Sequence, residues 1–104
     1  MIVLAAGPGD YSAKPRPFLV VQSDLFNASH GSFTLCPITS IVTGNALFRI
    51  AFAPEPGTGL REESEVQIDK VQSLRRARIV RAIGRASPTA MEQVDQALRR
   101  WLTL

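Results

Sequence analysis

The chain has 104 residues, of which 45% are hydrophobic and 20% are charged, and its formal net charge is +3. This length and composition are those of one small globular domain, so we expect a single domain over residues 1–104. No apolar run reaches the roughly 18 residues of a membrane span, and the apolar start lacks the basic residues of a signal peptide, so we expect no membrane partner. The single cysteine rules out an internal disulfide and fits a reducing, cytoplasmic environment.

The first three quarters of the chain predict short strands separated by turns. Apolar runs and alternating apolar and polar residues predict strands over residues 2–6, 17–22, 32–37, 47–53, 65–70 and 79–83. Segments rich in glycine, proline and polar residues predict the connections, which cover residues 7–15, 24–31, 39–45 (a loop or a single helical turn) and 54–59.

The end of the chain changes to helical periodicity. Ser87 and Pro88 are typical of the N-cap and first residue of a helix, because the amide that proline lacks has no helical partner there. Apolar residues then recur at helical spacing, namely Met91, Val94, Leu98, Trp101 and Leu102. We interpret this stripe as core or subunit interface. The architecture expected from these elements is a small, mainly β barrel with one C-terminal helix packed against it.

Several enzymatic constellations are missing from the sequence. His30 is the only histidine, which excludes a two-histidine acid–base pair within the chain and leaves a Ser–His–Asp triad without an identified orienting group. No group of His, Cys and carboxylates has the spacing of metal ligands, so we expect no metal and no cofactor. The one cysteine, Cys36, lies in an apolar run, where a buried structural thiol is expected rather than a nucleophile.

A cation between two prolines, at the start of an apolar strand, is the feature that suggests chemistry. Pro15 and Pro17 fix their own φ and restrain the residue before each of them, so the backbone of Lys14 and Arg16 is more constrained than most loop backbone. A positioned guanidinium beside a Thr or Ser hydroxyl can bind a phosphate and neutralise its developing charge. RNA supplies its own nucleophile, the 2′-hydroxyl. The alternative, a solvated arginine that merely starts a strand, stays open at this point.

The positive charge is concentrated in the last part of the chain. Residues after position 60 carry the whole excess, which is centred on Arg75, Arg76, Arg78, Arg81 and Arg85. Such a cluster attracts polyanions in a salt-dependent way, but it also serves to solvate one face of a strand or helix. By itself it is weak evidence for a nucleic-acid partner.

Five short motifs, in their order and spacing, resemble those of MazF/PemK-type toxins, the ribosome-independent mRNA interferases of type II toxin–antitoxin systems. They are residues 14–24 (KPRPFLVVQSD), residues 36–40 (CPITS), Leu60 with Ser64, residues 66–72 (VQIDKVQ), and Arg78-Ile79 with Ile83-Gly84. The resemblance extends from Ile2 to the terminal helix. It implies an SH3-like barrel with a C-terminal helix, a homodimer, and metal-independent cleavage of single-stranded RNA that leaves a cyclic phosphate.

The resemblance also implies roles for individual residues. Arg16 and Thr39 match the catalytic arginine and threonine of the family. Arg16 is expected to stabilise phosphate charge, with proton donation to the leaving 5′-oxygen as a second possible role, and Thr39 to hydrogen-bond a phosphate oxygen. The expected RNA contacts are Lys14, Ser40, Gln67, Asp69 and Lys70. The segment 7–15 is expected to shape the RNA groove, and a small acidic antitoxin with a disordered tail is the expected protein partner.

Two other functions stay open. A CcdB-like toxin on the same fold poisons DNA gyrase through residues of its C-terminal helix and has no use for an Arg–Thr pair. The other is a catalytically weakened barrel that only binds its antitoxin. It is suggested by a start at Met1-Ile2-Val3, without the usual basic residue and Gly-Asp, and by a short loop before Arg16.

Overall fold

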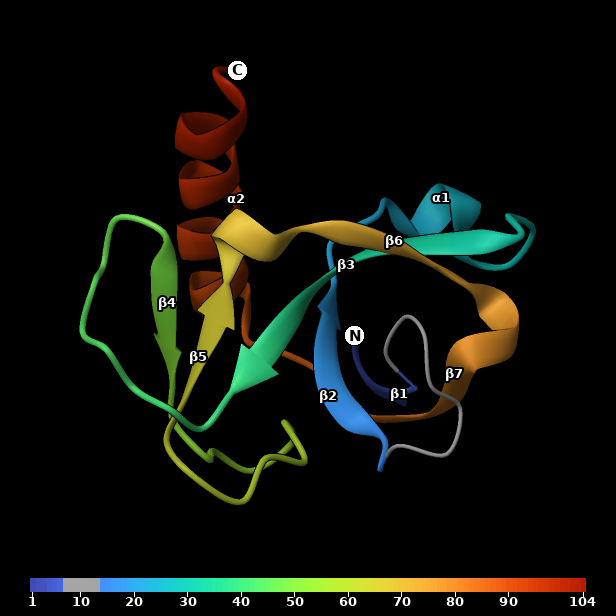
Figure 1. Ribbon diagram of the computed structural model, residues 1–104, viewed down its shortest axis with the longest axis horizontal. Helices are drawn as coiled ribbons and strands as arrows, with labels where there is room; N and C mark the ends of the chain where they lie inside the picture. The colour runs from blue at the N-terminus through green and yellow to red at the C-terminus, as the bar shows by residue number, and fades with distance from the viewer. Residues whose placement is uncertain (7–13) are drawn as a thin grey trace.

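The computed structural model describes residues 1–6 and 14–104, which form a mainly β structure with one long C-terminal helix (Figure 1). The strands are β1 (Ile2–Ala5), β2 (Arg16–Val20), β3 (Ser32–Thr39), β4 (Arg49–Phe52), β5 (Ser64–Gln67), β6 (Gln72–Arg75) and β7 (Ile79–Gly84). The helices are α1 (Asp24–Asn27) and α2 (Pro88–Leu102), with short 3-10 turns η1 (Ile68–Lys70) and η2 (Arg76–Arg78).

The sheet is antiparallel and follows the order β4-β5-β3-β2-β1-β7, with β6 added to β3. Its two end strands, β4 and β7, are not paired with each other in the described part of the chain, so the barrel is not closed. The expected mainly β, barrel-like architecture with a C-terminal helix is confirmed. β1, the strand that opens the chain, is hydrogen-bonded on both sides, to β2 and to β7.

β3 is the strand that joins the two halves of the sheet. Residues 32–35 pair with β6, residues 35–37 pair with β2, and Ile38 and Thr39 pair with β5. The change of partner falls between Pro37 and Ile38, where proline has no amide to offer to a ladder. Figure 1 shows β3 crossing the middle of the molecule, with β4, β5 and α2 to one side and β1, β2 and β7 to the other.

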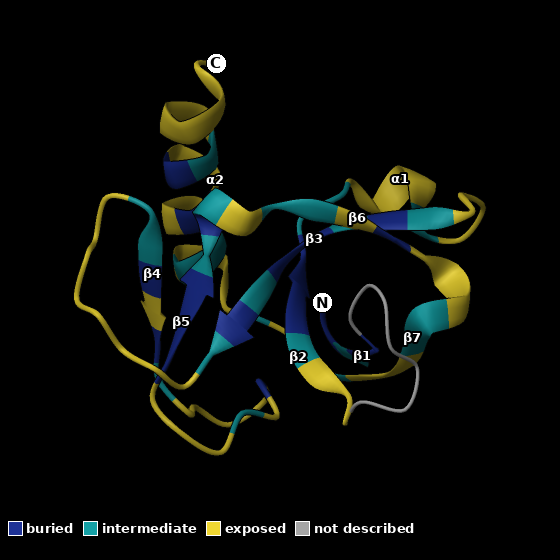
Figure 2. Ribbon diagram, in the orientation of Figure 1, coloured by how far each residue is buried: buried dark blue, intermediate teal, exposed yellow. Residues whose placement is uncertain are grey.

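Two hydrophobic clusters make up the core, because alternate residues of β2 and β3 face opposite ways. Figure 2 shows the buried residues along the strands and on part of α2. Leu19 and Cys36 belong to the cluster under α2, whereas Phe18 and Leu35 belong to the other. The buried members of the α2 cluster are Ile2, Leu19, Cys36, Ile38, Ile50, Phe52, Val66, Ile68, Val94 and Ala97. Those of the second cluster are Val3, Ala5, Phe18, Val20, Phe33, Leu35 and Leu74.

Several predicted boundaries were wrong. The strand expected over residues 65–70 ends at Gln67, because η1 replaces it with a turn in which the amide of Val71 donates to the carbonyl of Ile68 at 3.2 Å. Thr39, assigned to a loop, is the last residue of β3. Two elements were missed. β6 buries only Leu74 and is stabilised by its pairing with β3, and α1 is a single turn in which the Ser23 hydroxyl accepts from the amide of Leu25 at 3.2 Å.

α2 begins as predicted, with Pro88 first and the Ser87 hydroxyl accepting from the amide of Ala90 at 3.1 Å. The apolar stripe packs into the core through Val94, and Ala97 is buried in the same cluster. The last turn does not reach the core, since Trp101 is 47% exposed and its ring contacts that of Phe48 at 5.8 Å between centroids. In the described residues no helix has both the length and the apolar character needed to cross a membrane.

Candidate functional site

The two residues predicted to be catalytic lie at the same end of the β2–β3 pair. Phe18 pairs with Pro37; Arg16 precedes Phe18 by two residues and Thr39 follows Pro37 by two. Residues two apart on a strand share a face, so both side chains lie on the face that carries Phe18 and Pro37. Arg16 is exposed and Thr39 is half-buried, which leaves the guanidinium and the hydroxyl open to a ligand at this strand end.

The hydroxyl of Thr39 is held by its own loop. Its Oγ1 accepts a hydrogen bond of 3.1 Å from the amide of Ile41. Since that contact occupies a lone pair and not the hydroxyl hydrogen, the hydrogen is available to donate to an anionic oxygen. Lys14 and Ser40, which flank the pair in sequence, are both exposed and add a cation and a hydroxyl at the same end of the sheet.

One side of β4 and β5, here called the outer face, carries Arg49, Ala51, Glu65 and Gln67. It faces away from the α2 cluster, because the alternate residues Ile50 and Val66 belong to that cluster. Arg49 lies opposite Gln67, and Thr39 lies opposite Glu65. The outer face is therefore continuous with the end of β3 where Thr39 stands. Of the expected RNA contacts, Gln67 lies on this face and is half-buried.

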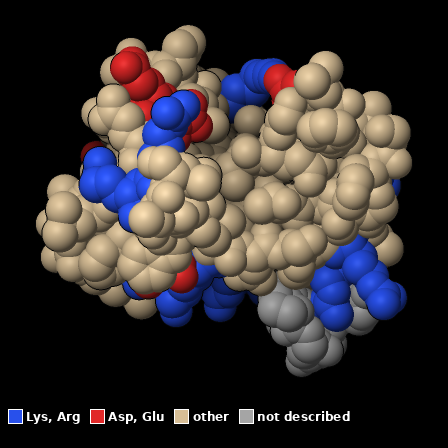
Figure 3. Space-filling model, turned by 90° about the horizontal axis from the view of Figure 1, so that it is seen from above, with Lys and Arg blue, Asp and Glu red and all other residues tan. Residues whose placement is uncertain are grey.

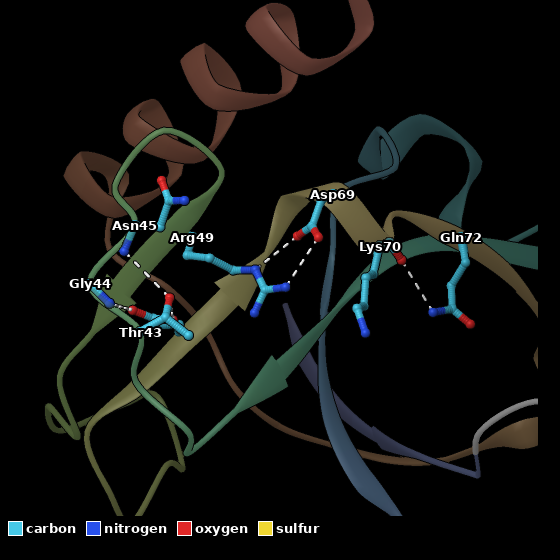
Figure 4. Close-up of polar contacts among 8 residues, drawn as sticks. Thr43, Gly44, Asn45, Arg49, Asp69, Lys70 and Gln72 are labelled. Atoms are coloured by element: carbon cyan, nitrogen blue, oxygen red, sulfur yellow. Dashed lines mark hydrogen bonds and ion pairs between the residues drawn. The ribbon is translucent and has the colours of Figure 1, made fainter.

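Asp69 and Lys70 follow in η1, and the structure gives Asp69 a partner that the sequence did not suggest. Arg49 Nε donates to Asp69 Oδ1 at 2.9 Å and Arg49 Nη2 donates to Oδ2 at 3.1 Å (Figure 4). The side chains are only 14% and 18% exposed. Such a two-pronged pair fixes the guanidinium on the outer face, while Lys70, next along the chain, is exposed.

Glu65 is the second residue that sequence reasoning missed. It is 1% exposed, its Oε1 accepts from the Thr43 hydroxyl at 3.0 Å and its Oε2 accepts from the Gly44 amide at 2.8 Å. Hydrogen bonds from the backbone of Thr43 and Gly44 lower the pKa of this carboxyl against the opposing effect of burial, and Arg49 adds to the lowering. In the sequence, the only sign of a role for Glu65 was its alternation with Gln67 on one face of a strand. For Arg49 the only sign was its place as a lone cation in an apolar strand.

Arg76, one member of the arginine-rich segment, makes structural contacts with the region that follows α1. The guanidinium of Arg76 lies over the Phe33 ring at 4.7 Å and donates to the carbonyls of His30 and Asn27. It therefore satisfies carbonyl groups at the C-terminal end of α1. On the face seen in Figure 3, Lys and Arg side chains form separate groups, partly interleaved with acidic ones. On this face the cations therefore do not form one continuous track.

The remaining titratable candidates are structural. His30 is exposed, and its Nδ1 lies 3.2 Å from the amide of Ser32, as expected of a solvated loop histidine. Cys36 is fully buried, and burial, with the charge of Asp69, raises its pKa to about 12. Such a thiol is protonated and covered, so it is no nucleophile. Across residues 1–6 and 14–104, no three His, Cys, Asp or Glu side chains stand close enough to hold a metal ion.

Comparison with known proteins identifies the family of this chain. Residues 1–102 match the family described as PemK-like, MazF-like toxin of type II toxin-antitoxin system. The probable endoribonuclease MazF of Mycolicibacterium smegmatis is 41% identical over 97 residues, covering 93% of this chain and 88% of the relative.

Solved structures show the same fold. The Mycobacterium tuberculosis toxin MazF-mt6 superposes with a TM-score of 0.83 at 23% identity, over 99% of this chain and 96% of that one. MazF in the MazE–MazF crystal structure from Deinococcus radiodurans has a TM-score of 0.79 at 25% identity, over 99% and 92% of the two chains. The predicted family is confirmed: this chain belongs to the PemK-like, MazF-like toxins of type II toxin–antitoxin systems.

Proposed function

We propose that this chain is an endoribonuclease toxin, a single domain over residues 1–104 that cleaves single-stranded mRNA in the cytoplasm and acts as a homodimer. The observation that carries the proposal is the position of Arg16 and Thr39 at one end of the β2–β3 pair, with both side chains on the same face. The family match and the relative named an endoribonuclease support the reaction class.

The reaction proposed is attack of an RNA 2′-oxygen on the adjacent phosphorus. The bond from phosphorus to the 5′-oxygen breaks, which leaves a 2′,3′-cyclic phosphate on one product and a 5′-hydroxyl on the other. One proton leaves the 2′-hydroxyl and one is gained by the 5′-oxygen, so the step needs neither a covalent enzyme nucleophile nor a metal. The protein then contributes position and charge stabilisation.

Within that step, the planar guanidinium of Arg16 binds the phosphate oxygens as their negative charge grows, and it is the candidate donor to the 5′-oxygen. Thr39 donates its hydroxyl hydrogen to a phosphate oxygen, because the Ile41 amide already occupies one of its lone pairs. Lys14, Ser40, Gln67 and Lys70 are proposed to contact the RNA on either side. Asp69 acts through Arg49, since a carboxylate beside a phosphate would repel it.

The proposed protein partner is a small acidic antitoxin that covers the site. MazF of Deinococcus radiodurans was crystallised with MazE, and this chain has a formal net charge of +3, which complements an acidic partner.

The test is cleavage of a labelled single-stranded RNA by the purified protein in the presence of EDTA. Arg16→Ala and Thr39→Ala should each lower the rate by about 100- to 1000-fold, the usual effect of removing a preorganised donor, without changing the melting temperature. Arg99→Ala, on an exposed position of α2, is the matched cation control and should cleave normally. RNA left intact by the wild type in EDTA would refute the proposal. Toxicity that survives Arg16→Ala but is lost in Trp101→Ala would instead favour a gyrase poison.

A further inference from the structure

Glu65 is a buried carboxylate for which the proposed reaction has no direct use. It stands directly across from Thr39 in the β3–β5 ladder, where paired Cα atoms lie about 4.5–5.5 Å apart, and both side chains are on the same face. Arg49, the cation whose charge helps to lower the pKa of Glu65, is already paired with Asp69 in a two-pronged contact. A negative charge in this place, 1% exposed, needs a structural or chemical reason.

General-base catalysis is the first reason to consider, and the geometry argues against it. Both carboxylate oxygens are occupied, Oε1 by the Thr43 hydroxyl and Oε2 by the Gly44 amide. The same contacts lower the pKa of the group, which weakens it as a base. The residue is also 1% exposed, so a substrate hydroxyl would have to compete with these two donors for a covered carboxylate.

The loop that covers Glu65 is the loop that begins at Thr39. The chain leaves β3 at Thr39, and the Ile41 amide turns back to the Thr39 hydroxyl at 3.1 Å. Two residues later, Thr43 and Gly44 both donate to Glu65, the residue paired with Thr39, and the chain turns at Gly44 with a φ of 78°. Hydrogen bonds therefore connect Thr39 to its own loop and the loop to Glu65, and the β3–β5 pairing places Glu65 next to Thr39 again.

We infer that Glu65 is a positioning residue that anchors the loop 40–45 and, through the Ile41 amide, fixes the hydroxyl of Thr39 for catalysis. The inference rests on the proposed function, because the orientation of Thr39 matters only if Thr39 binds the scissile phosphate. Loss of the anchor frees the loop, so the hydroxyl rotates among its conformers and the hydrogen bond to phosphate is made less often. Misplacement of a catalytic group by about 1 Å can cost about 100-fold in rate.

The experiment compares Glu65→Ala, Glu65→Gln and Thr43→Val with the exposed control Glu63→Ala, using three readouts. These are kcat and KM on a single-stranded RNA, the melting temperature, and amide hydrogen exchange of the segment 40–45. Glu65→Ala should lower kcat about 10- to 100-fold, change KM by less than about 3-fold, and speed loop exchange. Glu65→Gln should keep at least about a third of kcat, because the Thr43 hydroxyl can rotate to accept from the new amide. Thr43→Val should fall between them, and Glu63→Ala should match the wild type.

Each contrary result has a distinct meaning. A Glu65→Gln variant as slow as Glu65→Ala would overturn the inference in favour of a direct chemical role for the charge. A Glu65→Ala variant that cleaves RNA at the wild-type rate with a loosened loop would also overturn the inference, because the order of the loop would then have no effect on catalysis. If Glu65→Ala does not fold, Thr43→Val carries the test, and unchanged kcat and loop exchange in it overturn the anchor. If the wild type cleaves no RNA, the proposed function fails. The anchoring role is tested independently of cleavage, because it is refuted if amide exchange of the loop in Glu65→Ala is no faster than in the wild type.

Discussion

Removal of the Asp69 carboxylate is the perturbation that best distinguishes a structural role of this residue from a direct contact with RNA. The family resemblance implies that Asp69 contacts RNA, whereas in the structure its two oxygens accept from Arg49 at 2.9 and 3.1 Å. Exposed ion pairs contribute about 0–1 kcal/mol, and breaking a fully buried pair costs about 3–5 kcal/mol. With side chains 14% and 18% exposed, this pair lies between those limits, so we expect Asp69→Ala to cost about 2 kcal/mol of unfolding free energy.

In a domain of this size, a loss of about 2 kcal/mol lowers the melting temperature by about 8–16 °C. The assay is denaturant and thermal unfolding of Asp69→Ala, Arg49→Met and the double variant, which together give a coupling energy that we expect to be about 1–2 kcal/mol. Asp95→Ala, an exposed acidic position on α2, is the control and should unfold within about 0.5 kcal/mol of the wild type.

The same variants test how Asp69 affects RNA binding. If the carboxylate acts only by holding Arg49, the double variant should bind RNA no more weakly than Arg49→Met alone. A coupling energy near zero would refute the structural role. Additive losses in RNA affinity would show that Asp69 contacts the RNA itself.

Three further predictions follow from other parts of the structure. Because the pKa of Glu65 is lowered in the folded state from an ordinary value of 4.5, its stabilising effect is present above that value and is lost as the pH falls through the folded pKa. The difference in melting temperature between wild type and Glu65→Gln should therefore shrink from about pH 6 to about pH 3, and a constant difference would contradict this. Cys36, with a pKa of about 12, should react with a thiol reagent only after unfolding, whereas labelling of the folded protein at the rate of a free thiol would show that its burial is broken. A Cβ added at Gly84 would meet the backbone carbonyl of Thr58 at 2.3 Å, so Gly84→Ala should lower the free energy of unfolding by about 2–3 kcal/mol. At Gly31 a Cβ would meet nothing within 4 Å, so the control Gly31→Ala should change it by less than about 1 kcal/mol. Equal melting temperatures of the two variants would refute the packing argument.

Local patterns located the elements because each depends on neighbours in sequence. A continuous apolar run predicted the strand around Leu19, alternation predicted the strand around Val66, and the Ser87-Pro88 pair located the start of α2. The motif resemblance added Arg16 and Thr39, whose catalytic roles stay predictions. The pattern failed at η1, because Ile68 continues the alternation of β5 and is buried, although the backbone has already turned.

The sequence by itself determined a small β domain with a terminal helix, its family, and two residues proposed to act on a phosphate. The tertiary structure alone decided that Arg49 pairs with Asp69, that Glu65 accepts hydrogen bonds from the loop after Thr39, and that Arg76 donates to a carbonyl just after α1. Each of these contacts joins residues at least 20 positions apart. Periodicity reports which face a side chain takes, whereas a long-range partner depends on strand order and register, which the packing of the whole chain sets.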